Sequence, residues 1–260
     1  MKLNRLAFAL SAIFASASLM AETKPAPAVA APPAKPAAPT VKLPPQPPDV
    51  AAPKVGPDGE PQANFIKAHE NFVGIAKQGK TELLFLGDSI TAGWGGQKAI
   101  WEKAFGAYKP ANFGIGGDRT QHVLWRIQNG ELEGIKPKVA VLMIGTNNSG
   151  SDPAEGIAKG VTKIVQTIRG KTPATKILLL AVFPRGEKPN PQREKIQQVN
   201  AIIAKLDDRK HIFFLDIGSK FLQPGDLLTK EVMPDFLHLT PAGYQIWADA
   251  ISPELAELMK

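Results

Sequence analysis

Residues 83–93 read LLFLGDSITAG, a short apolar run that ends abruptly in Gly-Asp-Ser and passes into a glycine-containing turn. The run Leu83–Leu86 has the length of a buried strand in a parallel sheet, and open α/β sheets bind their ligands at the carboxyl ends of such strands. Ser89 is therefore predicted to stand at the functional edge of a sheet. Taken alone, it is more simply explained as an ordinary turn or helix-capping serine, since Asp and Ser are common in both roles.

Outward from this stretch, apolar runs of strand length alternate with segments of helical periodicity. Strands are predicted at 83–86, 109–113, 139–144, 176–183 and 211–216. Helices are predicted at 64–78, 97–105, 120–129, 153–169, 191–206 and 240–259. This alternation predicts the α/β class, with a parallel sheet covered by helices on both faces and joined by right-handed crossovers.

The first 61 residues do not have the composition of a globular domain. Residues 1–21 combine a basic start, a short apolar run and small residues suited to cleavage, which predicts a secretory signal peptide. The apolar run is well short of the ~20 residues that an uncleaved membrane anchor needs. Residues 22–61 hold more than half of the chain's 24 prolines and few large apolar side chains, which predicts a disordered Pro/Ala-rich linker. The remaining residues, 62–260, are predicted to form one domain.

Composition narrows the class of protein further. The chain has no cysteine, which excludes disulfides and cysteine metal sites. Its net charge of +7 is spread along the chain without a dense basic run, so a nucleic-acid partner is not expected. An exported protein without disulfides fits a bacterial periplasm or the extracellular space.

Two nucleotide-binding patterns occur and are rejected. Residues 74–81 match a phosphate loop literally, but here a helix precedes the pattern and a strand follows it, which reverses the required order. Residues 114–118 (GIGGD) resemble the start of a dinucleotide fingerprint, but Arg119 stands where the third glycine belongs.

A second group of residues gives Ser89 a chemical context. A serine hydroxyl needs a neighbouring base to attack an ester, and a histidine base needs a carboxylate to orient it. His238 lies in a late loop with Asp235 three residues before it, which makes this pair the best base in the sequence. The amides of Ser89 and Gly117 and the side-chain amide of Asn147 can supply oxyanion donors.

Each of these residues also has an ordinary structural explanation. Gly117 could serve a turn that needs a positive φ, and Asn147 could form an Asx turn. Asp235 could cap the turn that follows it, and His238 could pack beneath the last helix. Because all four residues occur in the required order at the predicted strand ends, the catalytic interpretation is stronger than these separate structural explanations. The elbow motif G-x-S-x-G of α/β-hydrolases is absent, because Thr91 occupies its last position.

The four blocks Gly-Asp-Ser, the later Gly, Gly-Thr-Asn-Asn and Asp-x-x-His resemble those of the GDSL/SGNH hydrolases. Within that family, the catalytic subunits of platelet-activating factor acetylhydrolase Ib are the most similar group, and the likeness covers about 65–258. It is carried by the segments NFGIGGD (112–118), QHVLWR (121–126), NGEL (129–132), PRG (184–186), NP (190–191), REK (193–195) and QVN (198–200).

The resemblance implies a flavodoxin-like three-layer α/β/α sandwich with a five-stranded parallel sheet. It implies Ser89 as nucleophile, with His238 and Asp235 completing the triad, and oxyanion donors at Ser89, Gly117 and Asn147. It favours a structural role for His122, and it calls for no metal or other cofactor.

The function expected is a serine esterase that removes short acyl groups, most simply acetyl, from a carbohydrate, glycan or lipid-like ester. Ile90 and Leu237, which flank the nucleophile and the base, are candidate walls of the acyl pocket. No transmembrane segment is expected after signal removal, and a homodimer is left open. The alternative is a non-catalytic glycan-binding or scaffold domain of the same fold, tethered at the cell envelope.

Overall fold

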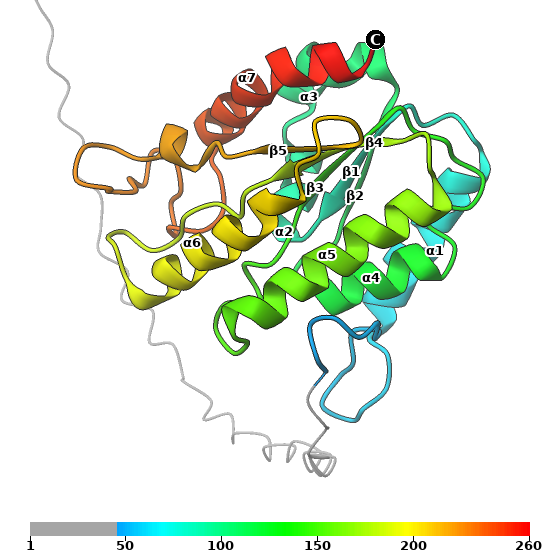
Figure 1. Ribbon diagram of the computed structural model, residues 1–260, viewed down its shortest axis with the longest axis horizontal. Helices are drawn as coiled ribbons and strands as arrows, with labels where there is room; N and C mark the ends of the chain where they lie inside the picture. Colours follow the sequence, from blue (N-terminus) through cyan, green and yellow to red (C-terminus); the bar gives the residue numbers. More distant parts are fainter. Residues whose placement is uncertain (1–45) are drawn as a thin grey trace, which may run out of the picture. The chain divides into compact units, whose positions relative to one another are not determined.

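The computed structural model describes residues 46–260, and the expected signal peptide lies outside them. Five parallel strands form one sheet in the order β2-β1-β3-β4-β5 (Figure 1). Their bounds are β1 Leu83–Gly87, β2 Pro110–Gly114, β3 Val139–Met143, β4 Lys176–Leu180 and β5 Ile212–Leu215. The chain moves outward from β1 to β2, then crosses back to β3 on the other side of β1, which is the topology of a doubly wound sheet.

Seven α-helices connect and cover the strands. Their bounds are α1 Ala63–Lys77, α2 Ser89–Ala92, α3 Lys98–Phe105, α4 Thr120–Gln128, α5 Ala154–Lys171, α6 Pro191–Ile203 and α7 Pro241–Leu258. Short 3₁₀ turns lie at Gly93–Gly96, Gly106–Tyr108, Ala204–Leu206 and Gly218–Phe221. The predicted strands and long helices are all present, and the main additions are the single turn α2 and the 3₁₀ turn that follows it.

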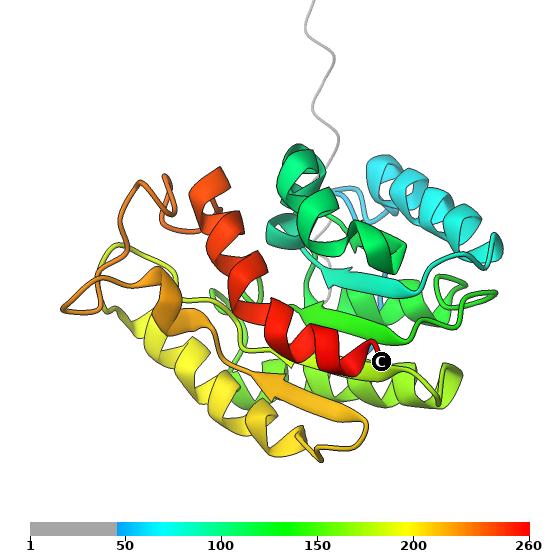
Figure 2. The same ribbon diagram turned by 90° about the horizontal axis from the view of Figure 1, so that it is seen from above.

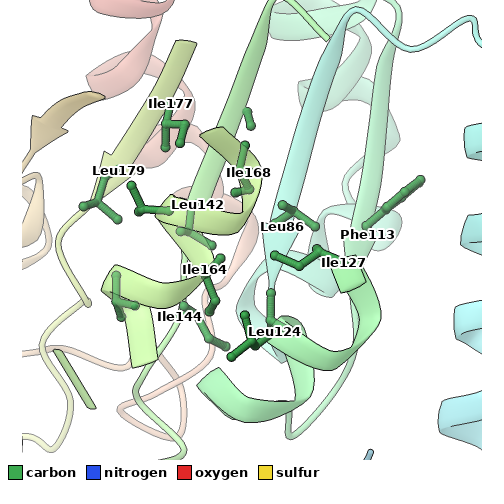
Figure 3. Close-up of a cluster of buried hydrophobic side chains, with 14 of the residues drawn as sticks. Leu86, Phe113, Leu124, Ile127, Leu142, Ile144, Ile164, Ile168, Ile177 and Leu179 are labelled. Atoms are coloured by element: carbon green, nitrogen blue, oxygen red, sulfur yellow. The ribbon is translucent and has the colours of Figure 1, made fainter. Parts of the chain in front are cut away.

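Strand β1 shows how the two faces of the sheet are built. All five of its residues are buried, because parallel strands are covered on both sides. Leu84 and Leu86 point into a core packed by α1, α4, α5 and α6, part of which is drawn in Figure 3. Leu83 and Phe85, one residue out of phase, point into a second core packed by α3 and α7. Helices α6 (yellow) and α7 (red) accordingly lie on opposite sides of the sheet in Figure 2. The three-layer α/β/α architecture is confirmed.

The segment 46–62, named here the N-terminal strap, differs from the expectation of a linker up to residue 61. It packs against the start of α4, where Thr120 Oγ1 donates to Pro48 O (2.7 Å) and Ala52 N donates to Gln121 O (3.2 Å). The sequence did not reveal this packing, because the strap has few apolar side chains, such as Pro48 and Ala51, and is held largely by hydrogen bonds. Among the helices of residues 46–260, none is long and apolar enough to cross a membrane.

Candidate active site

Ser89 lies at the point where β1 turns sharply into α2. Gly87 makes this turn possible, because a Cβ there would lie 2.1 Å from Thr91 Oγ1 and 2.5 Å from Met143 O. Asp88 then caps α2, its Oδ1 accepting a hydrogen bond from Ile90 N (3.0 Å). The serine side chain is thereby presented at the carboxyl edge of the sheet.

The structure brings Ser89, His238 and Asp235 together across 149 positions of sequence. Ser89 Oγ lies 2.9 Å from His238 Nε2, and His238 Nδ1 lies 2.6 Å from Asp235 Oδ2. The other carboxylate oxygen accepts from the backbone amides of His238 (2.7 Å) and Leu237 (3.1 Å). These bonds fix the carboxylate on one side of the imidazole and leave the other ring nitrogen facing the serine.

The same contacts set the ionisation of Asp235. Burial by itself raises the pKa of this carboxyl, but the hydrogen bonds from the His238 side chain and backbone and from Leu237 N outweigh burial. The pKa of Asp235 therefore lies below its ordinary value. An ionised carboxylate at this place favours the tautomer of His238 with its proton on Nδ1, which leaves Nε2 free to accept a proton from Ser89.

Gly117 and Asn147 follow the two strands that flank β1. Gly117 has a φ of +73°, a conformation that side chains with a Cβ rarely adopt. Asn147 Nδ2 donates one hydrogen bond to Asp118 O (2.8 Å), which joins the loop after β3 to the loop after β2. A side-chain amide carries two N–H groups, so a second donor remains on Asn147.

Behind this loop lies a set of buried charges that the sequence did not reveal. Arg126 is fully buried, and its Nε donates to Asp118 Oδ2 (2.9 Å) while its Nη1 donates to Glu131 Oε2. Its Nη2 donates to Phe113 O (3.0 Å) and approaches Gly87 O (3.4 Å). Arg126 thus ties the ends of β1 and β2 to the loop that carries Gly117.

Two further side chains complete the set. Lys54 Nζ contacts Asp118 Oδ1 (2.8 Å), and His69 Nδ1 lies 3.0 Å from Glu131 Oε1. Burial raises the pKa of Asp118 above its ordinary value, although Arg126 and Lys54 both oppose that rise. Three of these residues, Asp118, Arg126 and Glu131, lie in the segments 112–118, 121–126 and 129–132 that carried the family resemblance. The sequence gives no sign, however, that a charged side chain will be buried.

His122 does not face Ser89. Its Nδ1 accepts a hydrogen bond from Arg119 N (3.1 Å) at the start of α4, and its Nε2 lies 3.4 Å from Gln46 Oε1. Burial, followed by the nearby charges of Lys54, Arg119 and Arg126, lowers the pKa of His122 to about 3. It is a neutral residue that caps α4, in agreement with the structural role expected for it.

The two candidate pocket residues are placed differently. Both contact the second core, but Ile90 is only 1 % exposed within it, whereas Leu237 is half-buried at its margin beside His238. A side chain with so little accessible surface offers little area to a ligand, so the acyl-pocket prediction now depends mainly on Leu237. Within residues 46–260 there is no group of three or more His, Asp or Glu side chains arranged to hold a metal ion.

Asp88 is expected to make stability depend on pH. Its side chain is fully buried, and its Oδ2 has no hydrogen-bond partner among the described residues. Burial is the main cause that raises its pKa from 3.8 to about 7. The folded state holds this proton more tightly than the unfolded state does. The contribution of Asp88 to the free energy of unfolding is therefore complete below about pH 4 and declines as the pH rises to about 7.

Asp88→Asn keeps the acceptor for Ile90 N but cannot ionise. We expect the melting temperature of wild type to fall relative to that of Asp88→Asn between about pH 4 and pH 7. Thermal unfolding of both proteins over this pH range measures the difference between their melting temperatures. Titration of the other groups affects both proteins alike and therefore cancels in this difference. A difference that stays constant with pH would contradict the assignment.

Comparison with known proteins places this arrangement in a family. Residues 85–246 match the model of the GDSL-like Lipase/Acylhydrolase family. The chain is 42% identical over 195 residues to platelet-activating factor acetylhydrolase IB subunit alpha2 of Rattus norvegicus, covering 75% of this chain and 84% of the relative. It is 38% identical over 203 residues to subunit alpha1 of Homo sapiens, covering 78% and 87%.

A solved structure agrees at the level of fold. The acetyl-xylooligosaccharide esterase from Geobacillus Stearmophilus, solved as a mutant, superposes with a TM-score of 0.54 at 20% identity, covering 70% of this chain and 96% of that one. The alternative of a non-catalytic domain is not supported, because the matched family and the near relatives are acylhydrolases and acetylhydrolases. With Ser89 at the start of α2, directly after β1, and the acetylhydrolase subunits as near relatives, this chain belongs to the GDSL-like lipase/acylhydrolase family and is a carboxylic ester hydrolase of the GDSL/SGNH type.

Proposed function

We propose that the protein is a serine esterase in which Ser89, His238 and Asp235 act as a catalytic triad on short acyl esters. The observation that carries the proposal is the continuous hydrogen-bonded line from Ser89 Oγ to His238 Nε2 (2.9 Å) and from His238 Nδ1 to Asp235 Oδ2 (2.6 Å). This is the arrangement in which an imidazole can take the proton of a hydroxyl as that hydroxyl attacks a carbonyl carbon.

The first half of the reaction forms an acyl-enzyme. Ser89 Oγ bonds to the ester carbon, its proton passes to His238 Nε2, and the carbonyl electron pair moves onto the oxygen. The amides of Ser89 and Gly117 and the remaining N–H of Asn147 are the donors for that oxyanion. His238 then protonates the leaving alkoxide as the carbon–oxygen bond to the alcohol breaks.

The second half uses water in place of the serine. His238 Nε2 takes a proton from water as the water oxygen attacks the acyl carbon, and the same donors hold the second oxyanion. Collapse of this intermediate breaks the bond to Ser89 Oγ, which recovers its proton from His238. Asp235 stays ionised throughout and stabilises the imidazolium each time that it forms.

Acetyl is the acyl group that we favour. The relatives at 42% and 38% identity are acetylhydrolase subunits, and Leu237 stands half-buried next to His238, where it can limit the length of the acyl chain. For the alcohol part of the ester, we propose a carbohydrate or other glycan in preference to a lipid. The N-terminal composition supports export to a bacterial periplasm or the extracellular space, where acetylated glycans are accessible.

An ester panel tests the acyl preference. We expect chromogenic acetate to be hydrolysed fastest, with kcat/KM falling roughly tenfold or more by hexanoate, because even one methylene that a pocket cannot accommodate changes kcat/KM by about 10-fold or more. The same panel, extended to acetylated sugars and a short-chain acetyl phospholipid, ranks the alcohol classes.

Leu237→Ala is the matched variant for this panel. Removing its side chain is expected to narrow the gap between acetate and hexanoate without abolishing activity. Hexanoate hydrolysis as fast as acetate hydrolysis in wild type would refute the short-acyl proposal. A phospholipid preferred over every acetylated sugar would refute the glycan preference.

A further inference from the structure

The N-terminal strap reaches the loop that carries Gly117, although it lies outside the residues matched by the family model. Its path over α4 is fixed by the contacts of Pro48 and Ala52 described above, and Gln62 N donates to Lys54 O (2.8 Å) at its far end. The strap is thus held against α4 just before Lys54, and the residue that precedes α1 hydrogen-bonds to the backbone of Lys54 itself.

The side chain of Lys54 closes over this loop. Its Nζ donates to Gly116 O (2.6 Å) and contacts Asp118 Oδ1 (2.8 Å), so it holds the residues on either side of Gly117. The side chain is only 13% exposed, and Nζ lies 5.6 Å from the centre of the Phe65 ring. A Cβ built on Gly117 would lie 3.6 Å from the same nitrogen, which places the ammonium directly against the loop.

Lys54 also balances charge beneath the loop. Two buried carboxylates, Asp118 and Glu131, share the cation Arg126; Lys54 pairs with Asp118, and His69 Nδ1 lies 3.0 Å from Glu131 Oε1. His122, the other titratable group facing Asp118 (3.9 Å), is neutral because burial lowers its pKa to about 3. Without Lys54, the carboxylate of Asp118, next to Gly117, would have only Arg126, which it shares with Glu131.

We propose that Lys54 is a positioning residue that holds the Gly116–Asp118 loop in place as an oxyanion donor and cancels the excess negative charge behind it. This inference rests on the proposed esterase function. A negative charge develops at the oxyanion in the transition state, and an uncompensated carboxylate nearby disfavours that charge more than it disfavours the neutral ester. Loss of Lys54 therefore lowers kcat more than it raises KM.

A double-mutant cycle in the full-length protein separates charge balance from mechanical anchoring. The variants are Lys54→Met, Asp118→Asn and the two combined, with Lys67→Met, an exposed lysine on α1, as the matched control. Lys54→Met is expected to lower kcat on chromogenic acetate roughly 10- to 100-fold, less than outright deletion of an oxyanion donor, with KM within about threefold. Lys67→Met is expected to match wild type.

Neutralising Asp118 removes the excess charge that Lys54→Met creates. The combined variant is therefore expected to have a higher kcat than Lys54→Met alone, and thermal unfolding of every variant establishes that it is folded. A combined variant no faster than Lys54→Met would overturn the proposal, as would a Lys54→Met enzyme within about twofold of the Lys67→Met control.

Failure of the proposed function can be told apart from failure of this inference. If the hydrolysis by wild type survives in Ser89→Ala, the triad proposal fails, and the role of Lys54 is then decided by amide hydrogen exchange. The Asp118 amide, which donates to Ile115 O (3.1 Å), is expected to exchange faster in Lys54→Met than in Lys67→Met. Equal exchange rates would mean that Lys54 does not position the loop.

Discussion

Ser89→Ala is expected to lower kcat for a chromogenic acetate by on the order of 10³-fold or more, with little change in KM. In the proposed mechanism, the substitution removes the attacking oxygen and leaves the oxyanion donors in place, so binding is expected to survive while covalent chemistry stops. Among residues 46–260, the hydrogen bond of Ser89 Oγ is to His238 alone, so the fold and the melting temperature should be retained. Steady-state kinetics and thermal unfolding of purified protein measure both quantities.

Ser219→Ala is the control for this prediction, because Ser219 is an exposed serine on the 3₁₀ turn Gly218–Phe221. Its kcat and KM are expected to equal those of wild type. Activity of Ser89→Ala within tenfold of Ser219→Ala would show that some other group attacks the ester.

The second large effect concerns stability. Arg126→Met is expected to lower the free energy of unfolding by about 3–5 kcal/mol, because it leaves the Asp118 and Glu131 carboxylates buried without their shared cation. The substitution also removes the donor to Phe113 O at the end of β2. Urea denaturation, with the slope compared between variants, measures the loss.

Arg209→Met provides the matched control. The Arg209 side chain is 63% exposed and contacts Glu254 (2.9 Å) and Asp207 (3.8 Å), pairs of a kind that contribute little in water. We expect its loss to cost about 1 kcal/mol or less. If Arg126→Met were no more destabilising than Arg209→Met, the buried charges would not have the structural role assigned to them.

The fold, and the expectation that the loops of the site lie together, followed from the pattern of apolar runs in the sequence. A buried parallel strand reads as an uninterrupted apolar run, and all five residues of β1 are indeed buried. Once strands such as β1 and β3 are recognised, their carboxyl ends must lie at one edge, which brings the loops of Ser89, Gly117 and Asn147 together. The placement of His238 followed from chemistry, since a serine nucleophile requires a base.

The strap and the buried charges could not be predicted in the same way. Residues 46–61 have the proline and alanine content of a linker, and hydrogen bonds from Thr120 and Lys54 hold them without an apolar pattern. Asp118 and Arg126 belong to charged residue types that are mostly exposed, and their separation of eight positions does not by itself show that they pair in the interior. Ile90 shows a related limit: adjacency to the nucleophile in sequence placed it near the site, but the turn into α2 directs its side chain into the core.

Covalent labelling with a fluorophosphonate tests the central claim most directly, because this reagent phosphonylates a serine only where a base and an oxyanion site activate it. Peptide mapping after reaction is predicted to find the phosphonyl group on Ser89 of wild type and on no residue of Ser89→Ala, with labelling slowed by a competing acetyl ester. A wild-type protein that hydrolyses chromogenic acetate while Ser89 stays unlabelled, or that carries the label on another residue, would contradict the account.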